Sequence, residues 1–223
     1  MAAIERGFDL ARATAALSRQ DRKLARWIKR IGPIDNDFSL PFDPLAALAR
    51  SILYQQLSGK AAATIAGRVE ALMPRRGRIT AAGIHALDDD ALRGCGVSRQ
   101  KIAALRDLAQ KADDGIVPSA RKLAGMADDT IIEHLVQVRG IGRWTVEMLL
   151  MFRLGRPDVL PVDDLGVRKG AQRAHDLPDL PSPRQLRELG VRWAPWRSLA
   201  SFYLWRIADF GSEAAVKVRR SQD

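Results

Sequence analysis

Cysteine is nearly absent from the 223-residue sequence, where Cys95 is the single one. Histidine is also scarce, with three residues. A single thiol cannot form an internal disulfide, so the sequence excludes the disulfide framework of small secreted proteins. The same count excludes a zinc ribbon and an iron–sulfur cluster, because both kinds of centre need several cysteine ligands.

Long hydrophobic runs are also missing. The longest candidates, around Leu45–Leu57 and Val146–Phe152, are shorter and more mixed than the stretch of about 18 apolar residues that suggests a membrane-spanning helix. Near the N-terminus, Glu5, Arg6 and Asp9 interrupt any apolar segment, so this region does not resemble a signal peptide. We therefore expect an intracellular protein, located in the cytoplasm or in the nucleoid or nucleus.

Positive charge, in contrast, is abundant. Lysine and arginine number 36 against 26 aspartates and glutamates, which gives a formal net charge of +10. A disordered basic tail is excluded as the main feature, because 47% of the residues are hydrophobic. The charge favours a folded protein that meets an anionic partner: nucleic acid, a phosphorylated ligand or an anionic membrane. Charge alone does not choose among these three.

Apolar residues recur at helical spacing along almost the whole chain, and alternation of β-branched residues is scarce. This pattern predicts an all-α fold with short connections. It predicts a long amphipathic helix over Phe8–Ile31. It also predicts a helix over Thr130–Val138, with either Asp128 or Asp129 as its cap.

The most informative segment is Leu135–Val146, which reads LVQVRGIGRWTV. Its two glycines allow a very tight turn between two helices, and Ile141 between them can fill the space between those helices. Gly140 and Gly142 also let backbone N–H groups approach an anion, at a helix N-terminus where partial positive charge favours phosphate. An ordinary helical hairpin is the alternative, but an arginine on each side of the turn favours a nucleic-acid backbone.

Four blocks of sequence, in family order, resemble the helix-hairpin-helix (HhH-GPD) DNA glycosylases. They are the hairpin segment and the blocks Ile52–Ser58, Leu160–Asp164 and Arg192–Ser198. The resemblance covers roughly residues 40–210 and is closest to the 3-methyladenine DNA glycosylase II branch, which excises alkylated bases. It implies a two-lobed, all-α fold with an active-site cleft between the lobes and no N-terminal β-domain.

The resemblance also suggests how the chain is divided. A terminal lobe is expected from residues 1–42 together with 155–223, and a central lobe from residues 43–154, with the helix-hairpin-helix at 131–154. The polar tail over residues 211–223 is expected to fray, because it follows the last predicted helix.

The superfamily carries a catalytic aspartate at the N-terminus of the helix after the hairpin. Asp163 and Asp164 both stand there, and Asp164 takes the family position when the hairpin is aligned on Trp144 without a gap. Asp163 is the alternative, and helix capping alone is the other explanation for both aspartates. Breaking an N-glycosidic bond develops positive charge on the deoxyribose. A carboxylate about 4 Å away contributes on the order of 4 kcal/mol at an effective dielectric near 20, or roughly a thousandfold in rate.

Bifunctional members of the superfamily place a Schiff-base lysine just after the hairpin glycines, where this sequence has Trp144. Tryptophan cannot form an imine, so the resemblance implies hydrolysis of the base without strand cleavage. Trp144 and Trp205 match the aromatic residues that hold a flipped, cationic base, although a core role is the alternative for Trp205. By the same resemblance, Met148 and Leu165 match positions of this pocket where some members carry other aromatic residues.

Further residues are assigned to the DNA by resemblance. Gln56 matches the side chain that fills the gap left by the flipped base in the minor groove, and Gln55 either assists it or faces the interior. Phosphate contacts are expected from the hairpin and from a helix N-terminus, namely from Arg139, Gly140, Gly142, Arg143, Trp144, Ser98 and Lys101.

The family hairpin can also hold Na+ or K+ through backbone carbonyl oxygens, here those of Val136, Val138 and Ile141. No cofactor is expected to be required, and the single Cys95 excludes the iron–sulfur cluster of endonuclease III relatives. The expected partner is duplex DNA with damaged bases. No membrane and no obligate protein partner are expected, and the protein is expected to be a monomer.

Together these residues predict a monofunctional DNA glycosylase of base excision repair, which hydrolyses the N-glycosidic bond of alkylated purines such as 3-methyladenine and 7-methylguanine. A glycosylase for deaminated or oxidised bases is one alternative. A non-catalytic helix-hairpin-helix protein that binds DNA or senses damage is the other. Asp164 discriminates between enzyme and binding module, because a binding module needs the hairpin glycines but no carboxylate.

Overall fold

The computed structural model describes residues 6–74 and 77–211. Every regular element in these ranges is a helix, which confirms the predicted all-α class. The described chain divides into two compact units, residues 40–149 and residues 6–39 together with 150–211. Of the tail predicted to fray, residues 212–223 lie outside the described part. No helix within the described ranges is long and apolar enough to cross a membrane.

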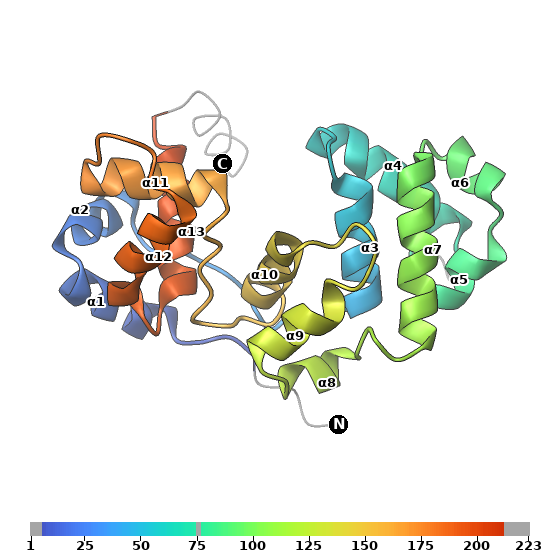
Figure 1. Ribbon diagram of the computed structural model, residues 1–223, viewed down its shortest axis with the longest axis horizontal. Coiled ribbons are helices and arrows are strands. Elements are labelled where there is room, and N and C mark those ends of the chain that lie inside the picture. The colour runs from blue at the N-terminus through green and yellow to red at the C-terminus, as the bar shows by residue number, and fades with distance from the viewer. Residues whose placement is uncertain (1–5, 75–76, 212–223) are drawn as a thin grey trace. The chain divides into compact units, whose positions relative to one another are not determined.

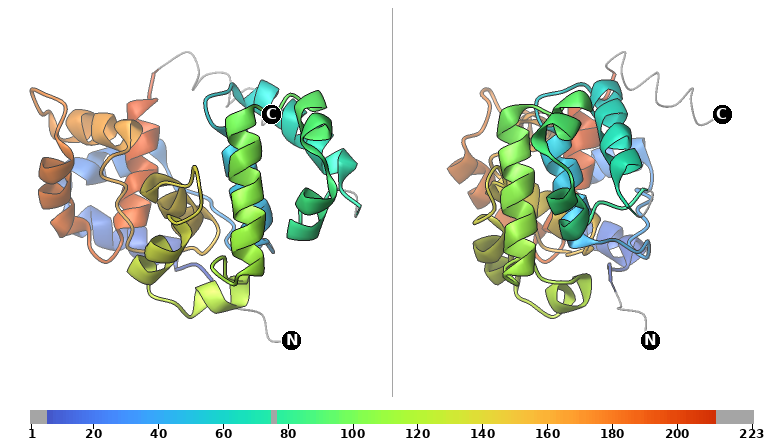
Figure 2. Two further views of the ribbon diagram at one scale, coloured as in Figure 1. Left: turned by 45° about the vertical axis from the view of Figure 1, so that its right-hand side comes forward. Right: turned by 90° about the vertical axis from the view of Figure 1, so that its right-hand side faces the viewer.

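The first unit is built around α7 (Arg99–Asp113), which lies side by side with α3 (Pro44–Tyr54) in Figures 1 and 2. α7 also contacts α5 (Ala81–Ala86) and α6 (Asp89–Gly94). The other helices of this unit are α4 (Gly59–Leu72), α8 (Ala120–Ala124), α9 (Asp128–Leu135) and most of α10 (Arg143–Phe152). Apolar side chains of α3 and α7 are fully buried, and removing them from water stabilises the unit.

Short polar side chains begin the helices α3 to α8. In each case an aspartate, serine or threonine oxygen accepts a backbone N–H of the first turn, which otherwise has no partner within the helix. The capping residues are Asp43, Ser58, Thr80, Asp88, Ser98 and Ser119. The starts of these helices are therefore encoded locally in the sequence.

α9 differs from its prediction at both ends. Ala127 occupies the cap position without a side-chain hydrogen bond, so neither Asp128 nor Asp129 caps the helix. Both aspartates lie instead in the first turn, where their negative charge interacts favourably with the helix dipole. The helix ends at Leu135 rather than at Val138, because a tighter turn follows: the N–H of Val138 donates to the carbonyl oxygen of Leu135 at 3.1 Å.

In the second unit, α13 (Arg197–Ala208) contacts α11 (Leu165–His175), α2 (Arg22–Ile31) and α1 (Leu10–Gln20). α12 (Pro183–Gly190) and the 3-10 helix η1 (Val191–Trp193) complete this unit, and Figure 1 shows these elements together. The crossing of α11 and α13 is unusually close. A Cβ at Gly170 would lie 2.0 Å from the carbonyl oxygen of Leu204, so the crossing requires glycine at this position.

The predicted helix over Phe8–Ile31 is two helices, because the chain breaks at Asp21. One oxygen of its carboxylate caps α2 by accepting two backbone N–H groups of the first turn, each at 3.0 Å. The other oxygen accepts the Nε1–H of Trp193 at 2.8 Å and lies 2.8 Å from Nε2 of His175. A single carboxylate therefore joins α2 to α11 and η1.

The carboxylate of Asp21 is buried, with only 4% of the residue exposed. Burial opposes its ionisation, but the hydrogen bonds from His175, from the backbone N–H of Leu24 and from Trp193 outweigh that effect. They hold the pKa of this carboxyl far below its usual value. The helix break is thus a structural feature of the second unit rather than a local irregularity.

Candidate nucleic-acid interface and active site

The turn between α9 and α10 is tight because Gly140 takes a φ of 79°, a conformation that side chains disfavour. The next residue, Ile141, is buried together with Leu135 and Val138, as expected of a side chain that fills the space between two helices. Its backbone N–H donates to the carbonyl oxygen of Val138 at 3.0 Å. The turn leads directly into the N-terminus of α10, where the positive end of the helix dipole favours an anion.

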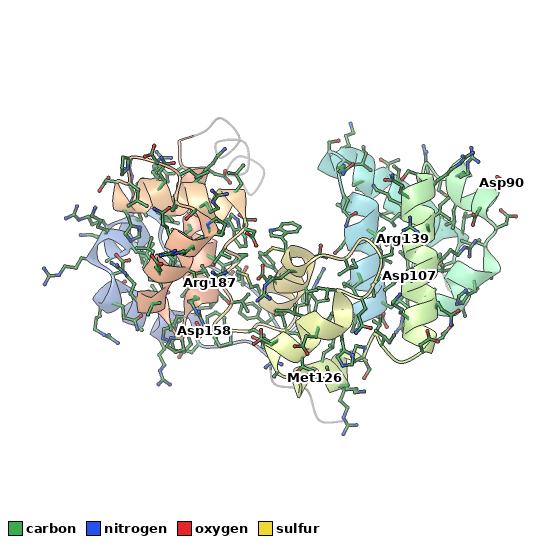
Figure 3. The ribbon with its side chains drawn as sticks, in the orientation of Figure 1. Asp90, Asp107, Met126, Arg139, Asp158 and Arg187 are labelled. Atoms are coloured by element: carbon green, nitrogen blue, oxygen red, sulfur yellow. The ribbon has the colours of Figure 1, made fainter. Side chains whose placement is uncertain are left out.

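α7 holds the hairpin turn from one side through Asp107. Its Oδ2 accepts the backbone N–H of Arg139 at 2.7 Å, and its Oδ1 lies 2.5 Å from Nζ of Lys111. Figure 3 labels Asp107 and Arg139, which lie next to each other where α7 meets the hairpin. Partial burial opposes ionisation of Asp107, but the Arg139 N–H and the lysine outweigh it and hold the pKa of this carboxyl below its usual value. The hairpin backbone is therefore anchored by a charged acceptor.

The two arginines beside the turn differ in their surroundings. Arg139 is exposed and its guanidinium extends from the segment that Asp107 anchors. Arg143 is the first residue of α10, and its Nε donates at 3.0 Å to the buried carboxylate of Glu147 one turn later. More than half of the Arg143 side chain is still exposed, so both positive charges lie at the surface beside the glycine turn.

The segment after α3 contacts the hairpin directly. The helix ends at Tyr54, and Gln55 donates from its side-chain Nε2 to the carbonyl oxygen of Gly140 at 2.8 Å. Gln56 follows with a φ of 56°, one of two positive values among the described residues other than glycine. The structure thus brings Gln55 to the hairpin glycine, although 85 residues separate it from Gly140.

The predicted phosphate contacts at the N-terminus of α7 make hydrogen bonds within the protein in this structure. The hydroxyl of Ser98 caps the helix by accepting the backbone N–H of Lys101. The ammonium of Lys101 donates to the carbonyl oxygens of Leu53 and Gln55 at 2.7 and 2.8 Å. Burial lowers the pKa of this lysine. The Lys101 ammonium is therefore engaged with the C-terminal end of α3, and its contact with phosphate stays a prediction.

In the second unit, Asp164 is the N-cap of α11. Its Oδ1 accepts the backbone N–H of Val167 and the indole Nε1–H of Trp205, both at 2.8 Å. Two donors on one oxygen, one from the backbone and one from a large ring, fix the plane of the carboxylate. Asp163 is exposed, whereas Asp164 is half-buried. The geometry distinguishes the two aspartates, which the sequence alone leaves as alternatives.

Aromatic rings surround the indole that holds Asp164. The ring of Phe152 stacks on Trp205 with centroids 5.8 Å apart, and Phe202 lies 6.0 Å from the same indole. Phe152 is 43% exposed and was not among the predicted site residues. The sequence does contain a signal for Phe152, namely its four-residue spacing from Met148 and Trp144. This spacing places the three side chains on one face of α10.

The predicted base-pocket residues are distributed over the two units. Trp144 and Met148 lie in the first unit, and the Trp144 ring is accessible, since the residue is 49% exposed. Leu165 and Trp205 lie in the second unit, where Leu165 is the first residue of α11 and 51% exposed. Trp205 is half-buried and bonded to Asp164, so it is neither a simple core residue nor fully exposed.

Side-chain metal ligands do not gather anywhere in the described ranges, where no group of three histidine, cysteine or acidic residues is found. The hairpin offers backbone oxygens instead, at Val136, Val138 and Ile141. The carbonyl of Val138 accepts the N–H of Ile141, and a carbonyl oxygen has a second lone pair available for a cation. Neutral oxygens of this kind suit a hard cation such as Na+ or K+ and not a soft metal.

Known proteins are similar to this chain in sequence and in fold. The chain matches the sequence model described as HhH-GPD superfamily base excision DNA repair protein over residues 49–195. DNA-3-methyladenine glycosylase 1 of Schizosaccharomyces pombe is 35% identical over 205 residues, which cover 90% of each chain. A solved structure of an S. pombe 3-methyladenine DNA glycosylase with abasic DNA has a TM-score of 0.80 and 34% identity, covering 90% of this chain and 98% of that one. A DNA-3-methyladenine glycosidase from Bacillus halodurans gives a TM-score of 0.81 and 35% identity, covering 91% of both chains.

An all-α fold with a glycine turn between two helices, followed by a helix capped by aspartate, is typical of DNA-repair proteins with a helix-hairpin-helix. The family match spans most of the chain, including the hairpin, Asp164 and the segment that contains Gln55 and Gln56. The protein belongs to the HhH-GPD superfamily of base excision DNA repair proteins, which confirms the resemblance of the four sequence blocks.

Proposed function

We propose that the protein is a DNA glycosylase of base excision repair that hydrolyses the N-glycosidic bond of alkylated purines in duplex DNA. The observation that carries this proposal is the carboxylate of Asp164, which Trp205 and the start of α11 hold in one orientation. A DNA-binding module needs the hairpin but has no use for a carboxylate fixed in this way. The names of the relatives, which are 3-methyladenine DNA glycosylases, support the same substrate class.

In the proposed reaction the C1′–N bond of the damaged nucleotide breaks, the bonding electrons leave with the base, and positive charge develops on the deoxyribose. The ionised Asp164 stabilises that charge, an effect of the order of 4 kcal/mol for a carboxylate about 4 Å away at an effective dielectric near 20. A water molecule then adds at C1′, and Asp164 orients it or accepts its proton. An alkylated purine already carries positive charge, so its departure needs little acid catalysis.

The damaged base must leave the stack to reach the carboxylate. We assign the flipped base to Trp144, Met148, Leu165 and Trp205, because aromatic faces attract cationic rings. Gln56 is the wedge that enters the minor groove and takes the place of the base. Phe152, stacked on Trp205, supports the ring that orients Asp164.

The grip on the duplex is assigned to the hairpin. Backbone N–H groups at Gly140 and Gly142 and at the start of α10 donate to a phosphate, with Arg139 and Arg143 adding positive charge. A monovalent cation held by the carbonyls of Val136, Val138 and Ile141 would add further positive charge at the same phosphate. The protein is proposed to act on DNA as a monomer and without an obligate protein partner.

Strand cleavage is not part of the proposed activity. Trp144 stands where bifunctional members carry the Schiff-base lysine, and an indole offers no amine for an imine. Incubation with methylated duplex DNA should therefore release free base and leave an intact abasic strand. A covalent protein–DNA adduct trapped by borohydride would contradict this part of the proposal.

Base release from methylated duplex DNA tests the proposal. We expect 7-methylguanine and 3-methyladenine to be released by the wild-type protein. Asp164→Asn should lower the single-turnover rate about a thousandfold while DNA affinity stays close to wild type. Asp163→Asn is the matched variant and should retain most activity. A wild-type protein that binds DNA but releases no alkylated base would identify a binding module, and release from hypoxanthine or 8-oxoguanine substrates alone would indicate a different glycosylase class.

A further inference from the structure

We propose that Lys101 and Gln55 are positioning residues that hold the wedge Gln56 in fixed register with the hairpin, so that phosphate binding and wedge insertion occur together. The proposal rests on the proposed function of the hairpin and of Gln56. Three hydrogen bonds carry it: from the Lys101 ammonium to the carbonyls of Leu53 and Gln55, and from the Gln55 amide to the carbonyl of Gly140. We call Lys101 and Gln55 the brace.

The end of α3 creates the need for such a brace. The last carbonyl groups of a helix have no partner within it, and a cation there is favourable because the helix dipole is negative at this end. Lys101 supplies both the donors and the charge from the neighbouring helix α7. Lys101 is half-buried, and its side chain extends toward α3 rather than into solvent.

The backbone of the wedge itself is strained. Gln56 has a φ of 56°, in the left-handed region, which costs a residue with a side chain free energy unless the surroundings hold it there. The residue just before it is held at two points, since the carbonyl oxygen of Gln55 accepts from Lys101 and its side-chain amide donates to Gly140. Both contacts fix the backbone immediately ahead of the wedge. The backbone that carries the exposed side chain of Gln56 is thereby held in place before DNA arrives.

The second contact of the brace acts on the hairpin. The peptide group that joins Gly140 to Ile141 is held at both edges, because its carbonyl oxygen accepts from Gln55 and its N–H donates to the carbonyl of Val138. A peptide group is planar, so fixing both edges fixes its orientation. That peptide lies between the two glycines whose backbone is proposed to bind phosphate.

Helix α7 contacts both the segment before Gln56 and the hairpin, and it therefore sets the distance between them. Lys101 holds the wedge segment, and Asp107, six residues later, holds the hairpin through the backbone N–H of Arg139. Six residues of helix correspond to about 9 Å of rise. Ala104 lies between them, and a Cβ at Gly140 would be 3.5 Å from its methyl group. Wedge and hairpin are therefore fixed to one rigid helix rather than only to each other.

The brace predicts a specific kinetic effect. A preorganised wedge lowers the cost of taking a paired base out of the stack, and it matters less for a base that has no partner to leave. Loss of the brace should therefore slow release of a paired lesion more than release of an unpaired one. A residue that only stabilised the fold would change both rates by the same factor.

The test compares Lys101→Met and Gln55→Glu with the wild type and with Lys122→Met, an exposed lysine of α8 in the same unit. The methionine keeps the apolar stem of Lys101 without its charge, and the glutamate keeps the shape of Gln55 without an N–H to donate. Single-turnover base release is measured for 7-methylguanine opposite cytosine and opposite a tetrahydrofuran abasic analogue. We expect both brace variants to lose about tenfold with the paired lesion and less than threefold with the unpaired one, whereas Lys122→Met changes neither.

A second measurement does not depend on catalysis. Duplex DNA that carries a tetrahydrofuran site next to 2-aminopurine becomes more fluorescent when a wedge unstacks that base. The wild type should raise the fluorescence, and the brace variants should bind this duplex with a smaller rise. This readout separates the two proposals, since a wild type without glycosylase activity can still show wedge insertion. Equal losses for both lesions, or unchanged rates and fluorescence in folded Gln55→Glu, would overturn the assignment of the brace.

Discussion

At the scale of single residues, the orientation of Asp164 depends on the indole of Trp205. The Nε1–H donates to the same carboxylate oxygen that caps α11. Trp205→Phe keeps an aromatic ring against Phe152 but removes this donor. A hydrogen bond to a charged group contributes about 1.5–3 kcal/mol, so we expect single-turnover base release to fall at least tenfold. The rate should fall without a matching loss of DNA affinity.

Trp27→Phe is the matched substitution for this prediction. Trp27 lies on α2 in the same unit and contacts Phe210 edge to face, with ring centroids 5.5 Å apart. Trp27 contacts α11 through Arg173 in the last turn of that helix, at the opposite end from Asp164, so base release should stay within about twofold of wild type. Equal rates for Trp205→Phe and wild type would show that the cap bond to Val167 alone is enough to orient the carboxylate.

Asp21 gives a second prediction at this scale, which concerns pH. Its pKa is far below the ordinary value of 3.8, because donors from His175, Leu24 and Trp193 outweigh the effect of burial. A carboxyl whose pKa is lowered by folding contributes stability that is complete above its unfolded pKa. That contribution is lost as the pH falls toward the folded value. Asp21→Asn should therefore be destabilised by about 3 kcal/mol at neutral pH.

The difference between wild type and Asp21→Asn should depend on pH in a defined way. Urea unfolding at pH 5 and at lower pH measures this difference in free energy. Below the ordinary pKa of 3.8 the difference should shrink by about 1.4 kcal/mol per pH unit, because the unfolded wild type then binds a proton that the folded protein does not. A difference that stays constant down to pH 3 would show that the stabilisation is not due to the charge.

At the scale of helices, the sequence predicts starts better than breaks. Asp43 and Ser98 are local signals, because each bonds to a backbone N–H only three residues later. The break at Asp21 depends on His175 and Trp193, which are 154 and 172 residues away, and no local pattern reveals those partners. The short helices α5 and α8 are also hard to predict, because six and five residues contain fewer than two turns of periodicity.

The crossing of α11 and α13 allows a prediction about Gly170. An alanine there would place Cβ 2.0 Å from the carbonyl oxygen of Leu204, a backbone atom that cannot move without shifting α13. Gly170→Ala should lower the free energy of unfolding by about 3 kcal/mol, at the upper end of the usual cost of overpacking.

Gly67→Ala is the matched control on α4, where no atom lies within 4 Å of the added methyl group. This control should raise stability by up to about 1 kcal/mol, because alanine is the better helix former. Urea unfolding of both variants checks the pair.

At the scale of the whole molecule, sequence identifies the parts of the site but not their connections. The hairpin glycines are recognisable because a tight turn constrains nearby residue types, and Asp164 because it starts a helix. The bond between Gln55 and Gly140 joins residues 85 positions apart, and Lys101 reaches α3 from α7. A lysine beside a serine at a helix N-terminus suggests a phosphate ligand, whereas its hydrogen bonds to the carbonyls of Leu53 and Gln55 depend on a neighbouring helix. Only the packing of α3 against α7 assigns it to the brace.

The salt dependence of DNA binding separates these two roles of positive charge. With a net charge of +10, the protein should bind duplex DNA more weakly as salt rises, and each phosphate contact contributes close to one unit to the slope of log K against log salt.

Arg139→Gln removes an exposed guanidinium at the hairpin and should reduce that slope by about 1. Lys101→Met removes an ammonium that donates to the carbonyls of Leu53 and Gln55, so the slope should stay as in the wild type even if affinity changes. Fluorescence anisotropy with an undamaged duplex measures both slopes. A range of about 50 to 200 mM salt is suitable, because affinity that depends on phosphate contacts changes strongly over it. A slope reduced equally by both variants would mean that Lys101 reaches phosphate when DNA binds, and would remove it from the brace.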